Sequence, residues 1–219
     1  MHRGVGRFSR RTAILSVLLS VFIVVMIAGG MILSAIGEVS DRANQLDDDR
    51  SRQTTAGALK TFIMQLGATL NDYAAWDDAA TYAYSKDGMD WMISNLGEMS
   101  ENSALFDVAI VVDTGGNVVL AYQDGKPMAT TPRQFFDSSL WRLLDEAKAS
   151  TAAPEARGFV KTSKGTAATG VALIRPKTGE FNQPQENRRY LVFARHLDGQ
   201  VPALGETYVV KGLQLVSPS

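Results

Sequence analysis

Cysteine is absent from all 219 residues, and histidine occurs only twice, as His2 and His196. The first absence excludes disulfide bonds, thiolate metal sites and a cysteine nucleophile. Two histidines cannot build a histidine-rich metal centre, so neither a metal nor a cofactor is expected. The chain also lacks a Gly-x-Ser-x-Gly turn, a Ser-x-x-Lys pair and a phosphate-binding Gly-x-x-x-x-Gly-Lys loop. We therefore expect a protein that is not an enzyme.

Charge is missing from residues 12–37, "TAILSVLLSVFIVVMIAGGMILSAIG". At about 1.5 Å per residue, a helix of this length crosses a ~30 Å hydrocarbon layer. A cleaved signal peptide would have an apolar region of only about 7–15 residues, so the pattern favours an uncleaved anchor. Arginines 3, 7, 10 and 11 precede the segment, whereas the first acidic residue, Glu38, follows it. The positive-inside rule predicts a cytoplasmic tail, residues 1–11, and an external domain.

Positive charge is also scarce in the expected external part. Without the four arginines, the chain has 18 basic and 23 acidic residues, a formal charge of −5. Because nucleic-acid binders present basic surfaces, we expect no nucleic-acid partner.

The region after the span has no proline as far as Tyr84 and begins as a polar stem, residues 38–54. Apolar residues at helical spacing follow and predict a buried helix: Leu59, Phe62, Ile63, Leu66 and Leu70. Val39, Leu46 and Gln53 recur every seven residues, which predicts a weak parallel homodimer through residues 38–66.

The rest of the chain predicts helices and strands in turn. "MDWMISNLGEM" is typical of a short helix, and "FDVAIVVD" and "NVVLAY" around "TGG" are typical of a hairpin. "TTPRQFFDSSLWRLLDEAKAS" indicates an amphipathic helix, and four further strands are expected at "GFVKTS", "AATGVALIRP", "RYLVFARHL" and "ETYVVKGLQLV". This order predicts an α+β domain with an antiparallel sheet flanked by helices.

Residues 71–84, "NDYAAWDDAATYAY", place a tryptophan beside two aspartates. If one helix continues through them, Tyr73, Trp76 and Asp77 share an inward face and Asp78 turns away. Asp77 is then either a buried carboxylate that accepts backbone N–H groups or an arginine (Arg157, Arg175 or Arg195), or a ligand-facing acid beside an aromatic wall. The second interpretation suits a cationic or amine-bearing small molecule.

The motif "DYAAWDD", followed by a tyrosine and by "WMISNLG", resembles the fourth class of CHASE domains, the cyclase/histidine-kinase-associated extracytoplasmic sensors of bacteria. The resemblance continues through "FDVAIVVDTGGNVVLAY" and covers about residues 55–216. It implies a PAS- or Cache-like sheet behind a long helix, in a protein anchored in the bacterial inner membrane with its main domain in the periplasm. The candidate ligand-binding residues are Tyr73, Trp76, Asp77, Tyr82 and Asn95.

The resemblance implies a sensory domain, residues 55–216, that binds a small signal and acts on a cyclic-di-GMP or histidine-kinase output. No GGDEF, EAL or kinase histidine motif occurs in this sequence, so we expect either a truncated receptor or a sensor that acts through partners. Two alternatives stay open, a ligand-free anchored adaptor and a periplasmic hydrolase that uses Asp77.

Overall fold

The structure is a computed structural model that describes residues 10–150 and 154–198. Its contacts divide the chain into two compact units, residues 1–53 and residues 54–219. Helix α1 (Arg10–Ala74) forms the described part of the first unit and continues into the second.

The first unit carries the candidate membrane span. Within the described ranges, α1 is the one helix that is long and apolar enough to cross a membrane. No residue in its most apolar stretch is buried. Large apolar side chains are exposed throughout this stretch, for example Leu15, Phe22 and Leu33. Such a surface is suited to lipid. The arginines Arg3 and Arg7 of the expected cytoplasmic tail lie outside the described residues.

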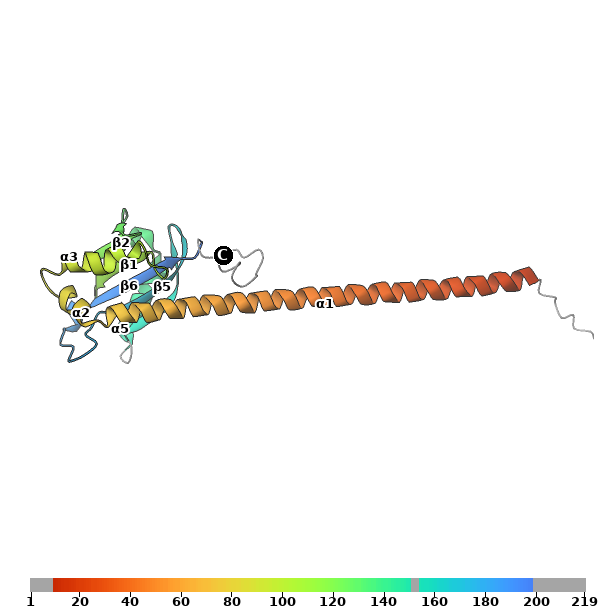
Figure 1. The fold of residues 1–219 in the computed structure, drawn as a ribbon, viewed down its shortest axis with the longest axis horizontal. Helices are drawn as coiled ribbons and strands as arrows, with labels where there is room; N and C mark the ends of the chain where they lie inside the picture. Colours follow the sequence, from red (N-terminus) through yellow and green to blue (C-terminus); the bar gives the residue numbers. More distant parts are fainter. Residues whose placement is uncertain (1–9, 151–153, 199–219) are drawn as a thin grey trace, which may run out of the picture. The chain divides into compact units, whose positions relative to one another are not determined.

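In the second unit, short helices precede the first strand and two more helices lie between the third and fourth strands (Figure 1). After α1 come α2 (Asp77–Ala83), α3 (Met89–Met92), the π-helical turn η1 (Ile93–Gly97) and the 3-10 turn η2 (Glu98–Ser100). Then follow β1 (Val108–Asp113), β2 (Val118–Gln123), β3 (Lys126–Pro127), α4 (Pro132–Phe135) and α5 (Ser138–Ala149). The chain continues with β4 (Glu155–Thr162), β5 (Gly165–Leu173), the 3-10 turn η3 (Gln185–Asn187) and β6 (Arg189–His196).

The strands form one antiparallel sheet in the order β3-β2-β1-β6-β5-β4. The predicted α+β class is therefore confirmed, as is the hairpin at Gly115 and Gly116, where Gly116 has a φ of 79°. The likeness to PAS and Cache folds stays a prediction. The last predicted strand, residues 206–216, lies outside the described residues.

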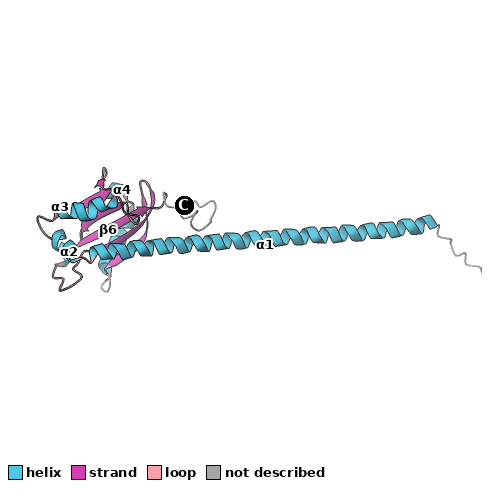
Figure 2. Cartoon of the chain, in the orientation of Figure 1, coloured by secondary structure: helices cyan, strands magenta, loops and turns pink. Residues whose placement is uncertain are grey.

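Helices cover both faces of this sheet (Figure 2). In β1, Ala109 and Val111 pack towards the core formed with α1, α2, α3 and η1, whereas Val108 and Ile110 pack towards α4 and α5. All four residues are fully buried. A strand that is covered on both faces needs apolar residues at every position, which explains the uninterrupted run "VAIVV".

Two predicted helices differ in detail from the structure. The helix expected over residues 130–150 is divided at Phe136, which is extended, and Asp137 caps the second part by accepting the N–H of Ser139. An N-cap aspartate begins a helix at its own position, which accounts for the division. The helix expected to end near Gly97 continues as η1 and η2 to Ser100.

Candidate functional site

The candidate site lies where α1 gives way to α2. Helix α1 ends at Ala74, and Trp76 is extended with φ −117° and ψ 130°, so the expected single helix through this region is wrong. The backbone N–H of Arg175 donates to the carbonyl of Ala74 at 2.9 Å, which satisfies one of the carbonyls left free at a helix end. Asp77 and Asp78 lie in the first turn of α2, where the helix dipole favours negative charge.

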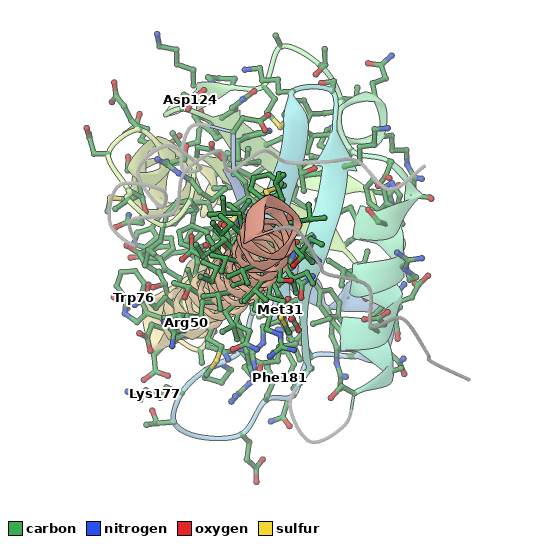
Figure 3. The ribbon with its side chains drawn as sticks, turned by 90° about the vertical axis from the view of Figure 1, so that its right-hand side faces the viewer. Met31, Arg50, Trp76, Asp124, Lys177 and Phe181 are labelled. Atoms are coloured by element: carbon green, nitrogen blue, oxygen red, sulfur yellow. The ribbon has the colours of Figure 1, made fainter. Side chains whose placement is uncertain are left out.

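Two neighbouring cavities open at this break. The larger, of about 620 Å³, is lined by Asn71, Asp72, Ala75, Trp76, Arg175 and Lys177. The second, of about 480 Å³, is lined by Asp72, Tyr73, Trp76, Asn95 and Met99. Asp72 and Trp76 belong to both, and Figure 3 labels Trp76 and Lys177 at the same edge of the unit. We refer to the two cavities together as the helix-break site.

Aromatic rings hold Trp76 in place. Its ring centroid lies 5.0 Å from that of Trp91 and 6.5 Å from that of Tyr73, and Trp91 in turn stacks on Tyr82 at 5.0 Å. Tyr73 continues inward, with edge contacts to the core ring of Phe193. Trp76 nevertheless keeps 36% of its surface exposed, so a packed aromatic ring still presents a free surface to the helix-break site.

Asp77 accepts backbone N–H groups, as one of its two interpretations predicted, but it does so at the surface and not in the core. Its carboxylate is exposed, and the backbone N–H groups of Lys177 (2.7 Å) and Thr178 (3.1 Å) and the hydroxyl of Thr178 (2.9 Å) all donate to it. The hydrogen bonds from Thr178 chiefly lower the pKa of Asp77 below its ordinary value of 3.8. The expected inward position of Asp77 is therefore wrong, because the helix breaks before it. Asp77 attaches α2 to the segment that follows β5.

The arginines considered as partners for Asp77 lie elsewhere. Arg157 lies against Gly67, where a Cβ would come within 2.7 Å of the guanidinium. Arg195 donates to the carbonyl of Ser103, and Arg175 lines the larger cavity.

Tyr84 makes a second attachment at the other end of α2. Its hydroxyl donates to the carbonyl of Ile174 and accepts the backbone N–H of Arg189, both at 2.9 Å. Burial raises the pKa of the Tyr84 phenol to about 12, because an ionised phenolate would lose its hydration there. Asp77 and Tyr84 thus hold both ends of α2 against the segment, residues 174–178, that carries Arg175 and Lys177.

The structure places the five predicted site residues in different surroundings. Tyr73, Trp76 and Asn95 line the helix-break site, and the Asn95 amide is oriented by donation to the Trp91 carbonyl at 2.9 Å. Asp77 instead lines a third cavity of about 420 Å³, and Tyr82 stacks on the outer side of Trp91 with 38% of its surface exposed. The ligand-binding role of all five stays a prediction.

Sequence reasoning did not select three charged residues of this site, Asp72, Arg175 and Lys177. Asp72, which precedes Tyr73, was not selected because the adjacent pair Asp77 and Asp78 forms a more recognisable motif. The signal for the other two was the "RPK" that ends the fifth strand, because proline cannot continue a strand and so turns the neighbouring basic side chains out of the sheet.

His196 belongs to a separate polar cluster. Its Nδ1 lies 3.0 Å from Asp107 Oδ2 and its Nε2 lies 3.0 Å from Thr162 Oγ1, an order that is reminiscent of a nucleophile, base and acid. The Thr162 hydroxyl, however, also donates to the Gly165 carbonyl, accepts the Lys164 N–H, and belongs to a residue that is only 7% exposed. The cluster joins the β4–β5 turn to β6 and β1.

A helix suited to a membrane that continues into an α+β unit with open cavities fits a membrane receptor. The family model of the CHASE4 domain matches residues 58–215, and the chain belongs to this family of sensory domains. A comparison with curated proteins gave no match.

Proposed function

We propose that this chain is the input part of a bacterial inner-membrane receptor and binds a small signal molecule at the helix-break site. Its tail, residues 1–11, lies in the cytoplasm, residues 12–37 cross the membrane, and the CHASE4 domain lies in the periplasm. The arginines before the apolar segment and the acidic residues after it support this orientation. The output, a cyclic-di-GMP enzyme or a histidine kinase, is supplied by a partner or by sequence beyond this chain.

One observation carries the proposal. Asn71, Asp72 and Tyr73 line the helix-break site, and they form the last turn of the same helix, α1, that includes the candidate span. A ligand in the site therefore touches the element that leads into the membrane. Binding transmits a signal if the ligand has a higher affinity for one arrangement of α1 than for another.

A second copy of the chain is the partner we propose for the stem. Val39 and Leu46 are exposed and lie seven residues apart, as in the seam of a parallel coiled coil. Leu59 and Leu66 already pack into the core of their own unit. The proposed homodimer contact is therefore confined to the stem before residue 54, which is shorter than the sequence alone predicted.

Ligand-dependent thermal stability tests the sensory function. The full chain in detergent micelles is heated with each member of a library of small metabolites, and we expect at least one compound to raise the melting temperature. Trp76→Ala should abolish that increase, because Trp76 lines both cavities. Phe159→Ala, which removes a more exposed ring (46% against 36% for Trp76) from β4, should leave it intact.

A wild-type protein that no compound stabilises would contradict the proposal and favour the ligand-free adaptor. A shift that survives in Trp76→Ala and disappears in Phe159→Ala would place the ligand elsewhere.

A further inference from the structure

The charges around the larger cavity identify a class of ligand, an inference that rests on the proposed function of the helix-break site. Arg175 and Lys177 supply two cations, and Asp72 supplies one carboxylate. The Asn71 amide also lines the cavity, and its nitrogen donates to the carboxylate of Glu155. The sequence pattern left two roles open for Asp77, and one of them was to hold a cationic ligand. Asp77 instead accepts hydrogen bonds from the backbone of residues 177 and 178, and the residues that line the cavity carry two positive charges and one negative charge.

Arg175 is the strongest anion-binding group in the cavity. Its backbone is fixed by the bond to Ala74, whereas its guanidinium makes no hydrogen bond or ion pair with any residue in the described ranges. A guanidinium presents a planar set of donors that matches a carboxylate. Lys177 interacts electrostatically with Asp77, and its backbone N–H is held by the same acid, so its position relative to Arg175 is set by Asp77.

Asp72 provides the opposite charge. It is exposed, lines both cavities, and its carboxylate has no hydrogen-bond or ion-pair partner in the part of the chain that the structure describes. The Trp76 ring also lines both cavities, and an aromatic ring beside a carboxylate is a favourable setting for an ammonium group. A dicarboxylate would instead bring a second negative charge towards Asp72.

We propose that the helix-break site binds a small zwitterion of the α-amino-acid type. Its carboxylate lies at Arg175 and Lys177, and its ammonium lies at Asp72 and the face of Trp76. Its side chain extends into the second cavity, which Tyr73, Asn95 and Met99 line. Arg175 also lines a cavity of about 530 Å³ with Arg188, whose positive charge attracts anions towards the same edge; Lys148 in that cavity is paired with Asp145.

Matched compounds test the charge requirement. Binding of the 20 common L-amino acids to the full chain in detergent is measured by calorimetry, and the tightest one is compared with its analogues that lack either the ammonium or the carboxylate. We expect the amino acid to bind best. The analogue without the ammonium, referred to as the carboxylate analogue, should bind more weakly, and the analogue without the carboxylate should show no binding.

Variants then assign each charge. Arg175→Gln should raise the Kd of the best amino acid by about 10- to 100-fold, since hydrogen bonds to charged groups contribute on that scale. Arg142→Gln, on the exposed side of α5, is the matched control and should leave the Kd unchanged. Asp72→Asn should reduce the preference for the amino acid over the carboxylate analogue.

The outcomes separate this inference from the proposed function. If a metabolite without a carboxylate binds and Trp76→Ala abolishes that binding, the sensory function stands and the zwitterion is wrong. Equal Kd values for Arg175→Gln and Arg142→Gln would also overturn the inference. If no compound binds at all, both proposals fail.

Discussion

Replacing Tyr84 with phenylalanine removes one oxygen atom that joins three elements. The hydroxyl lies between the Ile174 carbonyl at the end of β5 and the Arg189 N–H at the start of β6, while its ring belongs to the C-terminus of α2. The ladder between these strands continues next to it, since the Ile174 N–H donates to the Arg189 carbonyl at 2.9 Å. In Tyr84→Phe, one backbone donor and one backbone acceptor lose their partner.

The expected loss of stability follows from burial. Ile174 is fully buried, and a buried polar group without a partner costs about 1–3 kcal/mol. A small approach of the strands would let the two freed groups bond each other, so we expect the lower part of the range for the pair, about 2 kcal/mol. For a domain of this size, 1 kcal/mol corresponds to roughly 2–4 °C, and the melting temperature should fall by about 4–8 °C.

The assay compares the melting temperatures of the full chain and of two variants in the same detergent. Tyr82→Phe is the matched control, because its hydroxyl has no hydrogen-bond partner within the described residues. The pKa of Tyr84, about 12 in the folded state against an ordinary value of 10.0, adds a second test. A raised pKa stabilises the protein below pH 10, and that contribution is lost as the pH rises to 12, so the difference between wild type and Tyr84→Phe should shrink over this interval. Equal melting temperatures for Tyr84→Phe and Tyr82→Phe would refute the assigned role.

Three further predictions concern topology, assembly and Asp77. A reporter that is active only in the cytoplasm, fused after Ser219, should be silent, and strong activity would reverse the proposed orientation. Because the chain has no cysteine, Leu46→Cys and Asp48→Cys each carry a single thiol, and cross-linking should be stronger at position 46; equal yields would argue against a defined stem interface. Asp77→Asn should lower the melting temperature at neutral pH, whereas Asp78→Asn should not. A lowered carboxyl pKa stabilises the folded protein only while the carboxylate is ionised. The difference in melting temperature between Asp77→Asn and wild type should therefore diminish as the pH falls below 3.8. A pH-independent difference would show that the charge of Asp77 has no part in it.

Local patterns were sufficient to predict most of the elements. Strand β1 could be predicted from "VAIVV" and the turn after it from Gly115 and Gly116. The strand preference of β-branched residues and the turn preference of glycine both depend on only a few neighbouring residues. The helix break at Trp76 could not be predicted from local sequence patterns. Helical spacing continues through it without interruption, and the group that ends α1 at Ala74 is the N–H of Arg175, about 100 residues away in the sequence.

The same distant contact explains why the candidate site was only partly predicted. Tyr73 and Trp76 are near each other in the sequence, so an aromatic wall could be expected. Arg175 and Lys177 reach that wall only because Asp77 and Tyr84 attach α2 to their segment. The sequence left Asp77 either a structural role or a ligand-binding role. In the structure its carboxylate accepts hydrogen bonds from the backbone beside Arg175, a contact that depends on tertiary pairing.

Strand β6 is the last described strand to be synthesised, yet it lies in the middle of the sheet, between β1 and β5. Its pairing with β1 joins Val108 to Ala194, so much of the domain must be synthesised before the two halves of the sheet can meet. Contacts of this long range slow folding, because the chain loses loop entropy before it gains the contact. Until β6 is in place, the inner edges of β1 and β5 are unpaired. We expect the protein to be most exposed to proteases and to aggregation during this interval of folding.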